Sequence, residues 1–278
     1  MAKRVKSKID SFFEKLTLGN DFVFKMVLEN EVICKKLIEM VLGKPVVRIV
    51  SLETEKPLSE GFFSHSVRFD VYVDGSTDVI DFEIQCSPVA GIEKRIRDYQ
   101  ANIDVEQLRK GKPYSSLKES WIVFFCTFDP FKLGLPVYIV EQVFKDTHGT
   151  KYDDGTHKVF YNASAWQKCE DTEMRAFLKL IMGMKASTNY TRQIVHEMRT
   201  SLKREDVRRN VMRLQEIIDQ RVEEKKTMWL AQGDTQGFNR GSRDTKLQTA
   251  RRALGRGFAS DVVADLTGLT LDEVQSLL

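Results

Sequence analysis

The sequence predicts an α/β protein with an all-helical C-terminal extension. Strand-like and amphipathic helical segments alternate up to about residue 170, and beyond that point the pattern is helical only. Alternating strands and helices favour a mixed sheet covered by helices. We expect a core over 1–170, a helical extension over 171–230, a hinge loop over 231–244 and a short helical segment over 245–278.

Clear start and stop signals bound the elements of the core. Asn20 is a good N-cap for the first helix, and Gly43 followed by Pro45 ends it. Residues 74–77 (DGST) are a turn between two strands. The expected core elements are a helix over 21–42, strands over 46–54, 66–73 and 79–85, a helix over 93–110, and strands over 121–128, 137–144 and 158–161.

The strand expected over 121–128 has no polar face. Such a strand is typical of the centre of a sheet that is covered on both sides. The sheet therefore needs helices over at least one of its faces, and polar residues on its other strands need a reason to be there.

The C-terminal segment predicts a loop followed by short helices. The stretch AQGDTQGFNRGSRDT holds three glycines and no apolar period, which predicts the hinge loop. Ser260 can cap one short helix, and Thr270 with Glu273 forms a capping box for the last. Joined through Gly268, the two helices resemble half of a helix-turn-helix or a plain helical hairpin.

Composition excludes several classes of protein. With 42% hydrophobic and 30% charged residues, the chain can build a sizeable core and is not globally disordered. Its longest apolar run, Trp121 to Cys126, is far shorter than the ~18 residues of a membrane span. The four cysteines form no CxxC pair, which suits a reducing cytoplasm, and the histidines lack the spacing of zinc ligands. We expect a cytoplasmic protein without a membrane partner.

The formal net charge of +3 conceals a basic block. Residues 201–256 hold 14 basic and 8 acidic residues, and residues 1–8 hold four basic residues and no acidic one. Blocks of this kind are solvated helix faces or arms that bind a polyanion. Both readings stay open at this point.

The second predicted strand alternates apolar and polar residues. Since alternate residues of a strand share a face, Phe69, Val71 and Val73 are expected on one side. Asp70 and Tyr72 are then expected on the other side.

The third predicted strand places Asp81, Glu83 and Gln85 on one face. A register that joins the two strands across the 74–77 turn sets Asp70 opposite Glu83, with Cβ atoms ~5 Å apart. Two facing carboxylates repel each other, and a hard dication such as Mg²⁺ or Mn²⁺ removes that cost. The alternative is a hairpin whose polar face is simply solvated. The apolar strand expected over 121–128 argues against this alternative, because it requires helices over the sheet.

Five motifs now carry a resemblance to a known family. The segments NDFVFKMVL, VRFDVYV, DFEIQ, KRIRDYQ and FDPFKLGLPVY occur in this order. Together they resemble the PD-(D/E)XK nuclease-family transposases, which are similar to the recombination-promoting nucleases of bacteria. The resemblance covers roughly 17–230 and implies a restriction-endonuclease-like core, a mixed β-sheet flanked by helices, in a bacterial protein associated with mobile elements or DNA recombination.

The resemblance also implies roles for single residues. Asp70 and Glu83, with the backbone carbonyl of Ile84, correspond to the metal ligands. Gln85 stands where many members have the lysine that positions the attacking water; its amide still hydrogen-bonds water but carries no charge. Asp21 begins the first helix where an acidic residue often reaches the catalytic site, although the helix dipole alone also favours aspartate there.

The helix that follows the third strand carries four further candidates. Tyr99 and Gln100 resemble a pair that lines the site, and Tyr99 is otherwise a core tyrosine. Arg95 and Arg97 either meet phosphates or are solvated.

The sequence therefore predicts a Mg²⁺- or Mn²⁺-dependent endodeoxyribonuclease, a hydrolase that cuts phosphodiester bonds in DNA. Two other classes stay open. One is a DNA-binding accessory protein whose catalysis is weakened by Gln85 in place of lysine. The other is a helical oligomerisation or partner-binding protein in which 171–278 do the main work. A homodimer is also left open.

Overall fold

The computed structural model describes residues 16–46, 48–57, 68–108, 112–145, 148–209 and 235–278. The strands are β1 (Ile49–Pro57), β2 (Arg68–Gly75), β3 (Asp78–Gln85), β4 (Glu119–Cys126), β5 (Val137–Val140) and β6 (Thr156–Asn162). The α-helices are α2 (Asp21–Leu28), α3 (Glu31–Leu42), α4 (Ile92–Gln107), α5 (Thr172–Ile181), α6 (Asn189–Ser201), α8 (Thr235–Leu254), α9 (Ser260–Thr267) and α10 (Leu271–Gln275), and short 3₁₀ helices span Tyr114–Ser116 and Ala163–Lys168.

The six strands form one mixed sheet in the order β1-β2-β3-β4-β6-β5. The first three strands run antiparallel to one another, β3, β4 and β6 run parallel, and β5 returns antiparallel at the edge. The predicted apolar strand is β4, which lies inside the sheet and is fully buried over 122–126. The chain thus has the restriction-endonuclease-like α/β fold that the sequence predicted.

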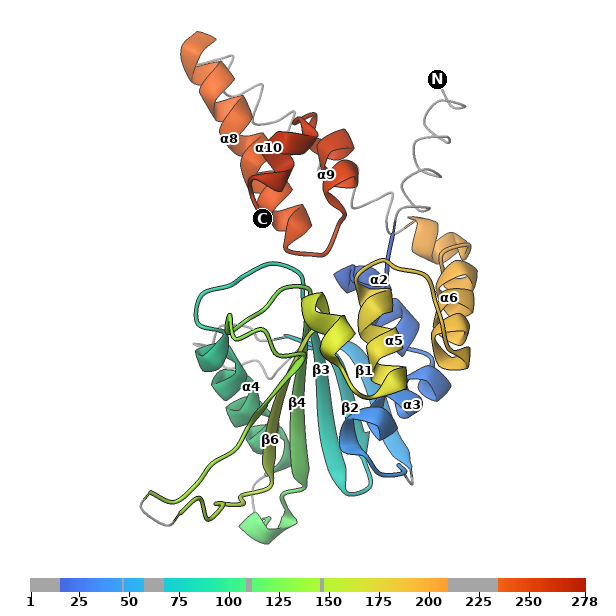
Figure 1. Ribbon diagram of the computed structural model, residues 1–278, viewed down its shortest axis with the longest axis vertical. Helices are drawn as coiled ribbons and strands as arrows, with labels where there is room; N and C mark the ends of the chain where they lie inside the picture. Colours follow the sequence, from blue (N-terminus) through green and yellow to red (C-terminus); the bar gives the residue numbers. More distant parts are fainter. Residues whose placement is uncertain (1–15, 47, 58–67, 109–111, 146–147, 210–234) are drawn as a thin grey trace.

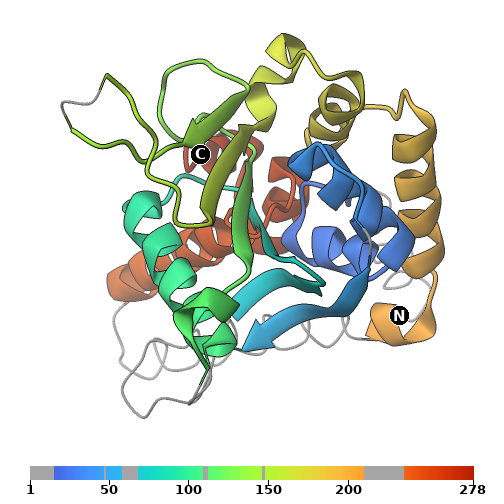
Figure 2. The same cartoon turned by 90° about the horizontal axis from the view of Figure 1, so that it is seen from below.

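Helices cover both faces of the sheet. Figures 1 and 2 show α4 on one face and α2, α3 and α5 on the other. The α4 side is packed by Ile96, Tyr99 and Ile103 against β4, and the opposite side is packed by residues such as Phe24 and Leu37. The polar side chains of β3, and Asp70 of β2, are therefore buried between the layers.

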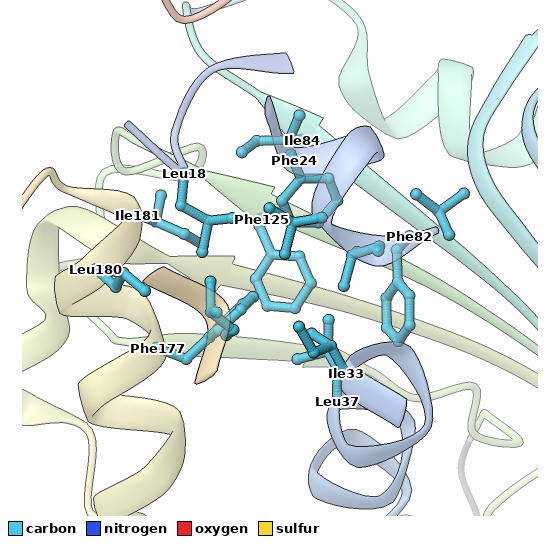
Figure 3. Packing of buried hydrophobic residues seen from close by; sticks show 14 of the residues in the cluster. Leu18, Phe24, Ile33, Leu37, Phe82, Ile84, Phe125, Phe177, Leu180 and Ile181 are labelled. Atoms are coloured by element: carbon cyan, nitrogen blue, oxygen red, sulfur yellow. The ribbon is translucent and has the colours of Figure 1, made fainter. Parts of the chain in front are cut away.

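Phe125 of β4 lies at the centre of the larger core cluster (Figure 3). Its ring centroid is 5.8 Å from that of Phe24, 5.9 Å from that of Phe82, and 5.2 Å from those of Tyr161 and Phe177. These rings come from the sheet, from α2 and from α5, so one side chain joins three elements.

The N-terminal helix predicted over 21–42 is two helices. Asn20 caps α2 as expected, accepting a hydrogen bond from the Val23 amide at 3.2 Å. Asn30 caps α3 in the same way, because its side chain accepts from two amides of the next turn and competes with helical continuation. Gly43 ends α3 in the left-handed conformation, as predicted.

The C-terminal helices differ from the prediction at two places, the expected hinge loop and the cap of α9. A loop was expected over 231–244. Residues 231–234 lie outside the described residues, and over the rest of that range α8 is helical from Thr235 onward and includes Gly237 and Gly241. Each glycine costs about 1 kcal/mol in a helix interior, whereas extending an existing helix adds one hydrogen bond per residue. The second half of α8 packs Ala250 and Leu254 in a cluster with residues of α9 and α10, and the helix extends from this packed half through the glycines.

The three helices α8, α9 and α10, here called the C-terminal module (residues 235–278), share a small core of their own. Its buried members are Ala250, Leu254, Val263, Leu269 and Val274. The capping box predicted between Thr270 and Glu273 is present. Ser260 is the first helical residue of α9, and Ala259 occupies the cap position in its place. None of the helices within the described ranges has the length and hydropathy that crossing a membrane requires.

Replacing Phe125 with alanine should lower the free energy of unfolding by about 3–5 kcal/mol, because the cavity lies where three elements meet. Urea unfolding followed by circular dichroism measures this change. Leu133→Ala is the matched control, since Leu133 is 69% exposed and its truncation should change stability by no more than about 0.5 kcal/mol. A loss below about 1 kcal/mol for Phe125→Ala would contradict the packing described above.

Candidate active site

Two carboxylates link β2 to β3 where the regular ladder between the strands ends. The ladder pairs Tyr72 with Asp81 and Val71 with Phe82, and its continuation sets Asp70 opposite Glu83. This is the predicted register.

Beyond the last ladder pair, side chains replace backbone as hydrogen-bond acceptors. The Asp70 amide donates to Glu83 Oε1 at 2.9 Å, and the Ile84 amide donates to Asp70 Oδ2 at 3.1 Å. Each carboxylate is thus fixed by the backbone of the strand that carries the other. The same contacts bring the backbone of Ile84 to the carboxylates; its carbonyl as a metal ligand stays a prediction.

The face of Phe69 differs from the prediction. Phe69 was expected beside Val71, but it packs in the cluster under α4, with its ring stacked on Tyr72 at 5.3 Å. Residues three apart lie on opposite faces of a regular strand, so the alternation shifts by one between Phe69 and Val71. The shift falls at Asp70, whose amide bonds to a side chain.

Helix α2 contributes a lysine that the sequence reading missed. Lys25 Nζ lies 2.9 Å from Asp70 Oδ1 and 2.9 Å from Asp21 Oδ1, and its side chain is buried. Asp21 is thereby joined to the site, as predicted for its position. The available signal was the spacing of Asp21 and Lys25, four residues apart on an otherwise apolar helix.

Helix α4 contributes an arginine that binds three site residues. Arg95 Nη2 lies 2.9 Å from Glu83 Oε2, and Arg95 Nη1 donates to Gln85 Oε1 at 2.7 Å. The Tyr99 hydroxyl accepts from Arg95 Nη2 at 2.6 Å and donates to Glu83 Oε2 at 3.2 Å. The Gln85 amide donates to the carbonyl of Ser87 at 2.8 Å. Arg95, predicted as a phosphate contact, therefore lies in the site itself.

Two predicted residues are not brought to the carboxylates. Gln100 donates to Ser120 Oγ at 2.7 Å and to Asp104 Oδ1 at 2.9 Å, near the start of β4. Arg97 is exposed on α4. Their proposed roles in lining the site and meeting phosphates stay predictions.

Asp81 is a buried carboxyl group without a hydrogen bond. Its side chain is 0% exposed, and neither oxygen has a partner among the described residues. The site thus gathers four carboxyl groups, Asp21, Asp70, Asp81 and Glu83, around two cations, Lys25 and Arg95. Full ionisation would leave two negative charges uncompensated.

The pKa values reflect this excess. Burial, then repulsion by Asp70, raises the pKa of Glu83 well above its usual range, and burial with repulsion by Glu83 does the same for Asp81. Burial and Asp21 raise the pKa of Asp70, and Lys25 opposes that rise. Burial lowers the pKa of Lys25, but Asp70 and Asp21 more than offset it, so the ammonium stays charged.

These residues fit a divalent cation. Carboxylate oxygens are the hard ligands that Mg²⁺ and Mn²⁺ prefer, and one dication would compensate the two negative charges that full ionisation leaves. Within the described ranges, no three acidic, histidine or cysteine side chains form a complete metal site. Asp70 and Glu83 would supply two ligands, and Mg²⁺ commonly completes its shell with water.

The mixed sheet and its buried carboxylates define a nuclease-like α/β protein. Residues 18–233 match the family model of the PD-(D/E)XK nuclease family transposases, and the chain belongs to this family. PD-(D/E)XK nucleases generally use divalent metal ions. No curated protein and no solved structure matches the chain. The family match ends before the C-terminal module begins.

The raised pKa of Asp81 predicts a pH-dependent cost of folding. The folded chain holds this proton at pH values where the unfolded carboxyl, with a pKa of about 3.9, has lost it. The free energy of unfolding therefore falls with rising pH above that value, by at most about 1.4 kcal/mol per pH unit. With EDTA present, Asp81→Asn should gain about 1–3 kcal/mol over the parent between about pH 5 and about pH 7.

Urea unfolding at the two pH values measures this gain. Asp98→Asn is the control, because Asp98 is exposed on α4. A difference between Asp81→Asn and the parent that is the same at both pH values would contradict the raised pKa.

Proposed function

We propose that this chain is a metal-dependent endonuclease that hydrolyses phosphodiester bonds in DNA. The proposal includes Mg²⁺ or Mn²⁺ as the ion and the bacterial cytoplasm as the location. One observation carries it: Asp70 and Glu83 are interlocked by backbone hydrogen bonds in a buried site that holds four carboxyl groups and two cations. Membership of the nuclease family supports DNA as the substrate class.

A dication bound by Asp70 and Glu83 would neutralise the scissile phosphate and make nearby water more acidic. The chain's own residues hold these ligands in place. Arg95 and Tyr99 donate to Glu83 Oε2, and the Asp70 amide donates to Glu83 Oε1, so both carboxylate oxygens of Glu83 are fixed. The ligands are therefore oriented before any ion arrives.

Lys25 supplies the positive charge that Gln85 lacks. Its ammonium is held against Asp70 from α2, on the side of the sheet opposite α4. A fixed cation beside the reacting phosphate stabilises negative charge that develops during attack. Gln85 retains one amide hydrogen beyond the one given to Ser87 and can orient water with it.

Cleavage of supercoiled plasmid tests the proposal. The purified chain should nick and linearise the plasmid with Mg²⁺ or Mn²⁺ and leave it intact with EDTA. Asp70→Asn and Glu83→Gln should slow cleavage at least about a hundredfold, since each removes a charged ligand worth several kcal/mol. Asp98→Asn is the control and should cut at the parent rate. Glu83→Gln cutting as fast as the parent would refute the assigned site.

The role of Lys25 has its own test. Lys25→Met should slow cleavage by about 10–100-fold, because the side chain keeps its length but loses its charge. Lys44→Met is a matched control: Lys44 Nζ pairs with Asp78 Oδ1 at 3.0 Å, at the other end of β3. Unchanged cleavage by Lys25→Met, where Asp70→Asn is inactive, would show that the ammonium is not needed.

A DNA-binding accessory protein is the second candidate. It is favoured by the bonds of Gln85, whose amide groups are engaged by Arg95 and the Ser87 carbonyl. If the chain is an accessory protein, the parent should bind DNA in Mn²⁺ without cutting it, and only the Gln85→Lys variant should cut. Cleavage by the parent chain decides for the endonuclease.

A further inference from the structure

The C-terminal module contacts the core through the glycine-rich turn Gly255–Gly257 and through Phe258, which follows it and packs against the larger core cluster. The carbonyl of Arg256 accepts a hydrogen bond from the Asp21 amide at 2.8 Å and another from Asn20 Nδ2 at 3.0 Å. These are the N-cap and first residue of α2. The module therefore holds the helix end that carries Asp21 into the site.

The contact is too close for a side chain at position 257. Gly257 has a φ of +78°, and a Cβ there would lie 2.1 Å from the carbonyl oxygen of Gly19 and 2.7 Å from Cys86 Sγ. A Cβ on Gly255 would lie 3.2 Å from Ser87 Oγ. The turn is thus fitted against two segments at once, the entry to α2 and the exit from β3.

Both segments lead directly into the carboxylate site. Asp21 pairs with Lys25, and Cys86 follows Gln85 in the chain. Figure 1 shows the module beside the N-terminal end of α2, beyond the ends of β3 and β4. Whatever the module binds is therefore held next to the site.

The end of the module nearest the core carries exposed arginines. Arg251, Arg252 and Arg256 are exposed, and none of them forms an ion pair within the described part of the chain. Arg243, which lies earlier in α8, is in contrast paired: its Nη2 lies 2.7 Å from Glu273 Oε1. The helix dipole favours cations at the last turn of α8, but Arg256 lies beyond that turn.

We propose that the C-terminal module binds the phosphate backbone of the DNA next to the site of cutting, through Arg251, Arg252 and Arg256. The proposal rests on the proposed function for its substrate class. Guanidinium groups bind phosphate oxygens in bidentate geometry, and such contacts are independent of sequence. Because the turn is fixed to α2 and β3, DNA held by the arginines passes the carboxylates at a constant distance.

DNA binding without cleavage tests the arginines. Binding of the full chain to a fluorescent duplex is measured in EDTA over a range of salt concentrations. Arg251→Ala/Arg252→Ala/Arg256→Ala should lower the slope of log affinity against log salt by about 2.7, since each lost phosphate contact lowers it by about 0.9. Lys36→Ala/Lys185→Ala/Arg199→Ala removes the same charge from exposed positions on other elements and should lower it by less than half as much.

This readout separates the two proposals. An equal fall in both triple variants would overturn the inference while leaving the endonuclease intact. A fall confined to the module variant, with no cleavage by the parent in Mn²⁺, would support the inference and refute the endonuclease.

The joint, meaning the contact of the turn Gly255–Gly257 with the start of α2 and the end of β3, is tested by a pair of glycine variants. Gly257→Ala and Gly268→Ala both place alanine in the left-handed region, but only position 257 is blocked by backbone; position 268 has only Lys246 Nζ, at 3.4 Å, nearby. Gly257→Ala should expose Cys86 to alkylation at least tenfold faster than Gly268→Ala, as read by peptide mass. It should also slow cleavage.

Equal alkylation of Cys86 in the two variants would overturn the proposed joint. Faster cleavage by Gly257→Ala would overturn the proposed role, because the module would then cover the site and not serve it.

Discussion

The exchange of hydrogen bonds between Asp70 and Glu83 is the constraint on which the site depends. Each carboxylate accepts from a backbone amide of the opposite strand, where the β2–β3 ladder ends. The strands therefore cannot separate or slip without breaking two hydrogen bonds to buried carboxylates, which costs more than losing ordinary ladder bonds.

The two helical layers balance the charge of the sheet from opposite sides. Lys25 comes from α2 and Arg95 from α4, so each layer contributes one buried cation to the same pair of strands. The compensation is incomplete because Asp81 has no partner among the described residues. A protein selected only for stability would replace such a carboxyl, and its presence is typical of a functional site.

The sequence predicted the register of the hairpin and the pairing of Asp70 with Glu83, because period-2 patterns and a short turn determine them. It could not reveal Lys25, since a lysine on a helix is usually solvated and only the three-dimensional fold brings it to Asp70. The prediction that Phe69 lies on the same face as Val71 was wrong, because a side-chain hydrogen bond at Asp70 interrupts the alternation of the strand. The contact of Gly257 joins residues more than two hundred positions apart, beyond the reach of local patterns.

The attachment of the turn to α2 uses the main-chain oxygen of residue 256 and leaves its guanidinium uninvolved. The attachment of the module to α2 and the positive charge at position 256 therefore depend on different parts of the same residue. A substitution at position 256 can change the surface charge without changing the backbone hydrogen bonds to α2. A side chain at position 257 would instead clash with the backbone of Gly19. Related chains should accordingly be able to exchange arginine for lysine at position 256, whereas position 257 should remain glycine.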